Sequence, residues 1–143
     1  MTTLLIRGLR LRTGAMLIAF VAQWLALPAS ADELKEFHTA VAQASAQYRV
    51  AMTTLETRGR EETSAAVQRF REAWQIVIDR RGTSRPAAFA DAEQYAGMFM
   101  QVDVRIVGAL IVIDIGSRDA ARDALAPIAE TLSQLSAAPA SPQ

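Results

Sequence analysis

Apolar residues recur at steps of three and four along most of the chain beyond residue 31, and this spacing limits its possible folds more than any other feature. On an α-helix such steps place side chains on one face, whereas a strand needs strict alternation. The pattern covers residues 32–57, 63–81, 91–115 and 118–135, with turn residues between them. It predicts one all-α domain over residues 32–136.

Each segment carries one apolar stripe that we expect to face the core. These stripes are Leu34, Phe37, Val41, Ala44, Tyr48, Met52 and Leu55; Val67, Phe70, Trp74, Val77 and Ile78; Tyr95, Phe99, Val102, Ile106, Ala109 and Ile113; and Ala121, Leu125, Ile128, Leu132 and Leu135. Residues 102–106 also alternate as a strand would, but no partner strand is evident, so we favour a helix.

Turn and capping residues divide the segments. Thr63 and Asp91 are suited to cap the second and third helices, and Gly116-Ser117 to form a tight turn before the fourth. Pro127 is expected to bend the fourth helix. The short first and last connections predict an antiparallel up-down-up-down four-helix bundle, with residues 82–90 as the longest connection.

Residues 1–31 have the pattern of a cleaved signal peptide. The only charges are those of Arg7, Arg10 and Arg12, and an uncharged run follows. Its apolar part, residues 15–27, would span ~20 Å as a helix against about 30 Å of hydrocarbon, so we expect no stable membrane span after cleavage. Small residues at 29–31 predict cleavage after residue 31 and a periplasmic location, with an uncleaved anchor as the alternative. Residues 137–143 are expected to be a disordered tail.

Composition excludes several classes of protein. The chain has no Cys, so disulfides, a lipid-modified Cys and covalent c-type haem are excluded. Without residues 1–31 the chain keeps all 15 acidic residues and 12 of the 15 basic ones, a net charge of about −3. Nucleic acid is therefore not an expected partner.

The segment Gly116-Ser117-Arg118-Asp119-Ala120-Ala121-Arg122, in this four-helix layout, resembles exported bundles of the cytochrome c-prime and soluble b-type cytochrome architecture. The resemblance implies a four-helix bundle. It does not extend to haem: the Cys-x-x-Cys-His attachment motif is absent, and residues 118–135 contain neither His nor Met to pair with His38. Haem is therefore not expected.

His38, the only histidine, lies at the edge of the first stripe. The predicted topology places it level with the start of the third helix, where Met98 and Met100 lie. One imidazole and one or two thioethers suit copper(I), which makes His38, Met98 and Met100 a candidate metal site. The alternative is a boundary histidine with Met98 filling the core.

No arrangement of residues typical of catalysis is evident. One histidine cannot supply two Glu-x-x-His pairs for a di-iron centre, and no nucleophile-base set or phosphate-binding glycine loop appears. We therefore expect a protein that is not an enzyme.

The third segment carries a second apolar stripe almost opposite the first, made of Met100, Val104, Val107, Gly108, Ile111 and Ile115. A second apolar face needs cover, and glycine permits close approach of another backbone. We expect contact with a second copy, as a homodimer, or with another envelope protein; residues 82–90 or the tail are the alternative cover. Asp103 and Asp114, at one edge of the stripe, are expected to pair with Arg of a neighbouring helix.

These patterns together favour a small exported bundle of the bacterial cell envelope that binds a partner protein or a metal ion, with copper as the candidate. The alternative is a b-type haem or other redox carrier of the periplasm.

Overall fold

The computed structural model describes residues 31–80 and 91–137, and these residues are all-α with no strand among them. The helices are α1 (Ala31–Thr57), α2 (Arg60–Arg80), α3 (Ala92–Asp114), α4 (Arg118–Leu125) and α5 (Ile128–Ala137). The prediction of an all-α chain is confirmed. Residues 102–106, which could also be read as a strand, lie within α3.

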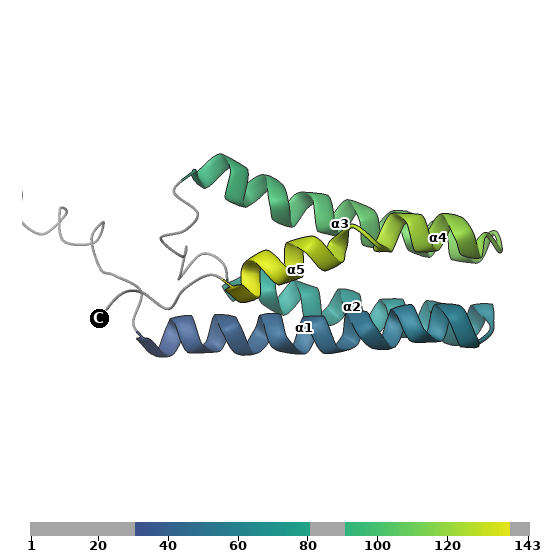
Figure 1. Cartoon of the computed structure of the whole chain (residues 1–143), viewed down its shortest axis with the longest axis horizontal. Helices are drawn as coiled ribbons and strands as arrows, with labels where there is room; N and C mark the ends of the chain where they lie inside the picture. The colour runs from purple at the N-terminus through teal and green to yellow at the C-terminus, as the bar shows by residue number, and fades with distance from the viewer. Residues whose placement is uncertain (1–30, 81–90, 138–143) are drawn as a thin grey trace, which may run out of the picture.

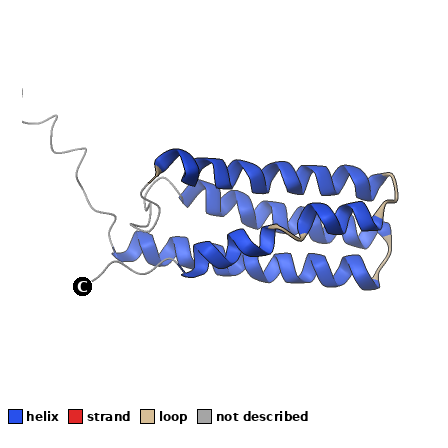
Figure 2. Cartoon of the chain, turned by 45° about the horizontal axis from the view of Figure 1, so that its top comes forward, coloured by secondary structure: helices blue, strands red, loops and turns tan. Residues whose placement is uncertain are grey.

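The helices lie side by side along one long axis (Figures 1 and 2). The α1–α2 and α3–α4 turns lie at the same end, which we call the closed end. α1 packs chiefly on α2, and α3 packs on both α2 and α4; α4 and α5 also contact α1, and α5 also contacts α3. α5 therefore fills the space between α1 and α3. The signal-peptide, 82–90 and most tail predictions lie outside the described residues.

The core consists of the predicted stripes. All the expected positions of α3, α4 and α5 are buried, and among those of α1 and α2 only Leu34, Met52 and Ile78 keep partial exposure. Trp74 stacks on Phe99 with ring centroids 5.4 Å apart, which joins α2 to α3. Because burying a large apolar side chain contributes about 1.5–3 kcal/mol, these stripes provide the main drive for folding.

The α3–α4 turn follows the predicted residues. Gly116 has φ of +85°, a conformation that glycine adopts without a steric penalty. The Gly116 N–H bonds to the Ile113 carbonyl (3.0 Å) and the Ser117 N–H to the Val112 carbonyl (2.8 Å), the paired bonds of a Schellman motif. The Ser117 hydroxyl then accepts from the Ala120 N–H and caps α4.

The prediction that Thr63 caps α2 is wrong, because α2 begins three residues earlier, at Arg60. The Thr63 N–H bonds to the Gly59 carbonyl at 3.0 Å, as in a helix interior. The Thr63 hydroxyl donates to the same carbonyl at 2.7 Å, and the side chain is buried. Thr63 therefore satisfies its own hydroxyl within the turn rather than capping the helix.

The predicted fourth helix is divided at Ala126-Pro127 into α4 and α5, rather than bent as one helix. Proline has no N–H and its ring clashes with the preceding turn, so the helical ladder stops there. The buried Tyr48 of α1 compensates: its hydroxyl donates to the Leu125 carbonyl at 3.1 Å and lies 3.4 Å from the Ala126 carbonyl. Burial raises the pKa of this hydroxyl, and a hydrogen bond from the Ala129 backbone lowers it to a smaller extent.

Candidate functional site

The second stripe of α3 is exposed along the helix, and we call it the outer face. Met100, Val104, Ile111 and Ile115 are 70%, 64%, 59% and 75% exposed. Val107 and Gly108 lie between them and are half-buried. Residues 82–90 and 138–143, the alternative cover, lie outside the described part of the chain. Four large apolar side chains in one stripe form the kind of surface that marks an interaction site.

Caps at both ends fix where α3 begins and ends. The Asp91 carboxylate accepts from the N–H groups of Glu93 (2.9 Å) and Gln94 (3.1 Å), which confirms the predicted cap. With the helix started there, Phe99, Val102 and Ile106 point into the core and the outer face points away. Two apolar faces make α3 long and apolar enough to cross a membrane by length and composition, although one face is buried against the other helices.

The edges of the outer face carry opposite charges. On the edge toward α2, Asp103 Oδ1 accepts from Gln75 Nε2 at 3.2 Å. On the edge toward α5, Arg105 lines a groove between α3 and α5. Arg60 of the neighbouring α2 contacts Asp114 through its backbone: Arg60 Nη1 donates to the Asp114 carbonyl at 3.0 Å. The described partner of the Asp103 carboxylate is the Gln75 amide. The last carbonyls of a helix have no N–H partner within that helix, so the long Arg60 side chain can bond to the Asp114 carbonyl at the end of α3.

Gly108 leaves open space on the outer face. A Cβ at this position would have no neighbour within 4 Å outside the helix's own backbone. Glycine inside a helix costs about 1 kcal/mol relative to alanine. Contacts among the residues that the structure describes therefore give no reason for glycine here.

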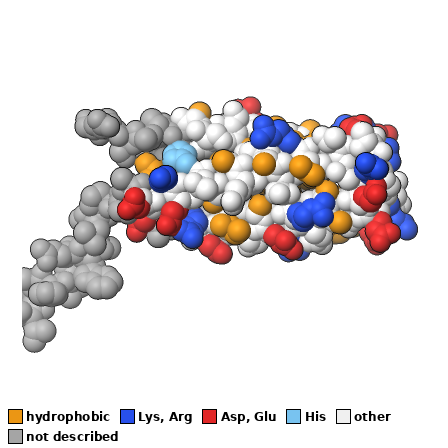
Figure 3. Space-filling view, turned by 90° about the horizontal axis from the view of Figure 1, so that it is seen from below, with side chains coloured by type: hydrophobic (Ala, Val, Ile, Leu, Met, Phe, Trp, Pro, Cys, Tyr) orange, Lys and Arg blue, Asp and Glu red, His pale blue; other side chains and the backbone are white. Residues whose placement is uncertain are grey.

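Figure 3 shows the molecule from the side of α1, opposite α3 in Figure 1. Hydrophobic atoms on that side are scattered among basic and acidic side chains rather than gathered in one stripe. Such scattered apolar atoms are normal for a protein surface. The outer face of α3 differs, because its exposed apolar side chains form one continuous stripe.

The structure places the two candidate thioether ligands, Met98 and Met100, on different sides of α3. His38 is on the same side of α1 as Glu56, 18 residues or about five turns further on, and Glu56 contacts α4. Met98 lines the α3–α5 groove, and Met100 is on the outer face. His38 thus faces the α4–α5 side of α1, while Met98 meets α5 from α3. Copper binding at His38 remains a prediction, for which the structure does not gather both thioethers.

The core positions of α5 do not supply the second ligand of a haem held between the first and last helices. No group of three or more His, Cys, Asp or Glu side chains in the described ranges could hold a metal ion. α5 directs Ile128, Leu132 and Leu135 into the core. These aliphatic side chains do not provide a second axial ligand to pair with His38.

The α3–α5 groove is a feature that the sequence reading missed. It has a volume of about 540 Å³ and is open to solvent, with Gln94, Gln101, Thr131 and Gln134 among its polar lining residues. Pro127 also lines it. Pro127, which was expected to bend the fourth helix, was the one sequence signal for an opening there.

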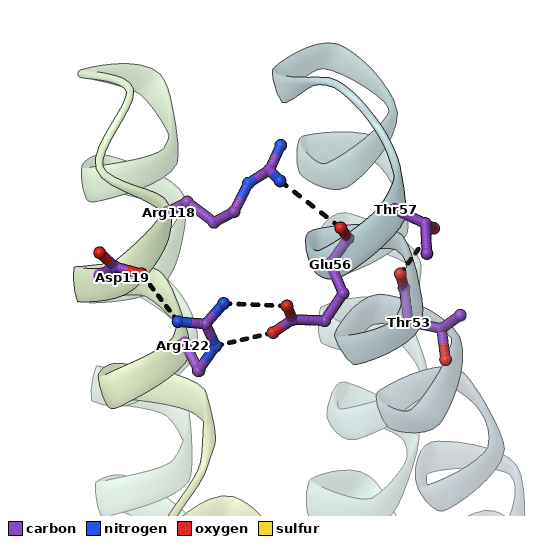
Figure 4. A network of polar contacts seen from close by, with 6 residues as sticks. All are labelled: Thr53, Glu56, Thr57, Arg118, Asp119 and Arg122. Atoms are coloured by element: carbon purple, nitrogen blue, oxygen red, sulfur yellow. Dashed lines mark hydrogen bonds and ion pairs between the residues drawn. The ribbon is translucent and has the colours of Figure 1, made fainter.

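Figure 4 shows a polar network that holds α1 against α4 near the closed end. Arg122 forms a bidentate pair with Glu56, at 2.7 and 2.9 Å, and also binds Asp119 at 2.7 Å. Arg118 donates to the Glu56 and Arg58 carbonyls. The hydrogen bonds and charge of Arg122 lower the pKa of Glu56. These side chains are committed to holding helices together, so we assign them a structural role.

Comparisons with protein-family models, curated proteins and solved structures found no match to this chain. The function is therefore inferred from the surface and core described above.

Proposed function

We propose that this protein is an exported antiparallel four-helix bundle of the bacterial cell envelope, periplasmic after loss of residues 1–31, which works by binding a protein partner through the outer face of α3. The observation that carries the proposal is the continuous exposed stripe of Met100, Val104, Ile111 and Ile115. Removing apolar surface from water contributes roughly 25 cal/mol per Å². A partner that covers this stripe therefore gains free energy that the isolated chain leaves unused.

The up-down-up-down topology is supported by the two tight turns at the closed end and by the helix neighbours. The α1–α2 and α3–α4 connections span only residues 58–59 and 115–117. Such short connections reverse the chain direction. The outer face then extends along one side of the bundle.

A binding role also agrees with how the charged side chains and the candidate metal and haem ligands are placed. The carboxylates and guanidiniums of the polar network near the closed end are bonded to each other or to backbone carbonyls. Met98 and Met100 lie on different sides of α3, and the core positions of α5 are aliphatic. The exposed stripe is apolar surface that the described helices leave outside their packing.

Site-specific photo-crosslinking in the native compartment tests the proposal. With a photoreactive residue in place of Met100, we expect a crosslinked product that Val104→Asp removes by placing a charge in the contact. Val50→Asp is the matched control, because Val50 is also exposed (45%) but belongs to α1. If no product forms, or if both aspartate variants reduce it equally, binding through the outer face is wrong.

Absorption spectroscopy distinguishes the redox-carrier alternative from the binding proposal. Protein purified from its host should show no Soret band under the binding proposal. A haem spectrum that persists in the Val104→Asp variant would favour the carrier instead.

A further inference from the structure

We propose that a small tetrahedral oxyanion, such as inorganic phosphate, binds at the closed end of the bundle, between the guanidinium groups of Arg60 and Arg118. This site is separate from the outer face of α3, and the proposal does not depend on a partner there.

A small cavity lies at the closed end, beside the first turns of α2 and α4. It has a volume of about 80 Å³. One water molecule needs about 10–15 Å³ of such volume, so the cavity has room for roughly five. A phosphate or sulfate ion also has five heavy atoms and therefore fits. The lining residues are Leu55, Arg60, Thr63, Ile113, Gly116 and Arg118.

The two charged side chains that line this cavity are both cationic. Arg60 comes from α2 and Arg118 from α4, and the lining contains no carboxylate. Among the residues that the structure describes, neither guanidinium forms an ion pair with an acidic side chain. The Glu56 carboxylate near Arg118 is held by Arg122 in the bidentate pair. Two cations on one cavity repel each other, and an anion between them is attracted to both.

Hydrogen bonds to backbone carbonyls hold both guanidiniums in place. Arg60 Nη1 donates to the Asp114 carbonyl at 3.0 Å, and Arg118 donates to the Glu56 and Arg58 carbonyls at 3.5 and 2.9 Å. Figure 4 shows Arg118 extending from α4 toward α1. Because a guanidinium carries five N–H groups, this structural role leaves most of its donors for another acceptor. A ligand would therefore meet arginines that are already positioned.

The positions of the two arginines in their helices also favour an anion. Arg60 is the first residue of α2, and Arg118 is the first residue of α4. The N-terminus of a helix carries partial positive charge, which favours acidic side chains and disfavours basic ones. The next residues, Glu61 and Asp119, follow this preference, whereas the two arginines oppose it. A bound oxyanion would offset the positive charge that accumulates there.

Thermal unfolding of the full chain, expressed with residues 1–31 and purified after export, tests the site with inorganic phosphate as the probe. Because both arginines are exposed, we expect weak binding, with a dissociation constant on the order of 1 mM. A concentration of about 10 mM should then raise Tm by roughly 5 °C. Sodium chloride at equal ionic strength should raise it by under about 1 °C. Equal rises in the two salts, or none in phosphate, would overturn the proposal.

Charge-removing variants locate the site. Arg60→Gln and Arg118→Gln should each weaken phosphate binding about tenfold, which reduces the rise in Tm to roughly 2 °C. Arg69→Gln is the matched control, because Arg69 is exposed on α2 but outside the cavity, and it should keep the full rise. The rise is compared rather than Tm itself, since Arg60 and Arg118 also bond to backbone carbonyls. A full rise in both variants, or an equal loss in the control, would refute the site.

Arginine modification tests the unaltered chain, so its result does not depend on whether the variants fold. Phenylglyoxal modifies guanidiniums, and mass spectrometry follows each arginine separately. Phosphate at about 10 mM should slow the modification of Arg60 and Arg118 about tenfold, because the site is then about 90% occupied. Arg69 should react at an unchanged rate. Equal slowing at all three arginines would contradict a site at the closed end.

A second probe distinguishes free phosphate from a phosphate group on a larger molecule. Glycerol 3-phosphate would place its phosphate in the cavity and leave its glycerol in solvent. Equal rises in Tm with the two probes assign the site to phosphate groups in general, and a rise with inorganic phosphate alone assigns it to the free ion. A rise with neither probe refutes the oxyanion site.

Discussion

The hydrogen bond from Tyr48 to the Leu125 carbonyl should be worth more than an ordinary side-chain bond, because it compensates for the interruption at Pro127. Tyr48→Phe removes only the hydroxyl and keeps the edge-on contact with Phe70, whose ring centroid lies 5.5 Å away. A buried carbonyl left without a donor costs about 1–3 kcal/mol. We expect a loss of about 2 kcal/mol in the free energy of unfolding.

The measurement is urea and thermal unfolding followed by circular dichroism. For a domain of this size, 1 kcal/mol corresponds to about 4 °C, so Tm should fall by roughly 8 °C with an unchanged denaturant slope. A Tyr48→Phe protein that unfolds at the parent's midpoint would show that the bond contributes nothing.

A double-mutant cycle tests the reason for the effect. Pro127→Ala returns an N–H to the backbone and lets the helical ladder continue, so that the Leu125 carbonyl can accept from the Ala129 N–H instead. On this background Tyr48→Phe should cost under about 0.5 kcal/mol, a coupling of about 1–2 kcal/mol. The reasoning is refuted if Tyr48→Phe costs the same amount with and without Pro127.

Three further predictions concern other parts of the fold. Gly116→Ala should destabilise the protein by about 1–2 kcal/mol in urea unfolding, since φ is +85° there, whereas Gly59→Ala, without a positive φ, should not; equal effects would contradict the turn assignment. The lowered pKa of Glu56 means that the unfolded chain binds a proton more readily, so stability should fall as pH drops below about 4.5, and less steeply in Glu56→Gln. A parallel loss in both proteins would exclude this carboxylate as the cause. In a copper(I) competition titration, Met100→Ala should bind as the parent does, because Met100 is 70% exposed on the outer face of α3, while Met98 lines the α3–α5 groove; a tenfold loss would contradict that placement.

The core was readable from sequence because helical periodicity and burial reflect the same geometry. The stripe from Tyr95 to Ile113 is buried throughout, and the exposed stripe from Met100 to Ile115 followed from the same spacing. Caps at Asp91 and Ser117 were also predictable, since a short polar side chain before a helix has few other uses.

Pairings between distant helices could not be read in this way. Nothing in the sequence around Tyr48 indicates that its hydroxyl meets Leu125, 77 residues away. The placement of Met98 and Met100 on different sides of α3 also bears on the predicted copper site, since periodicity gives the face of a residue but not the neighbouring helix. Thr63 was misassigned because its side chain can bond equally well inside a helix turn.

The position of α5 between α1 and α3 affects the order in which the chain can fold. Its three core residues cover apolar surface on α1 and α3, yet α5 is made long after α1. Until α5 is made, the apolar surface that it covers on α1 and α3 stays exposed to water, so the core is complete only when the last helix is in place.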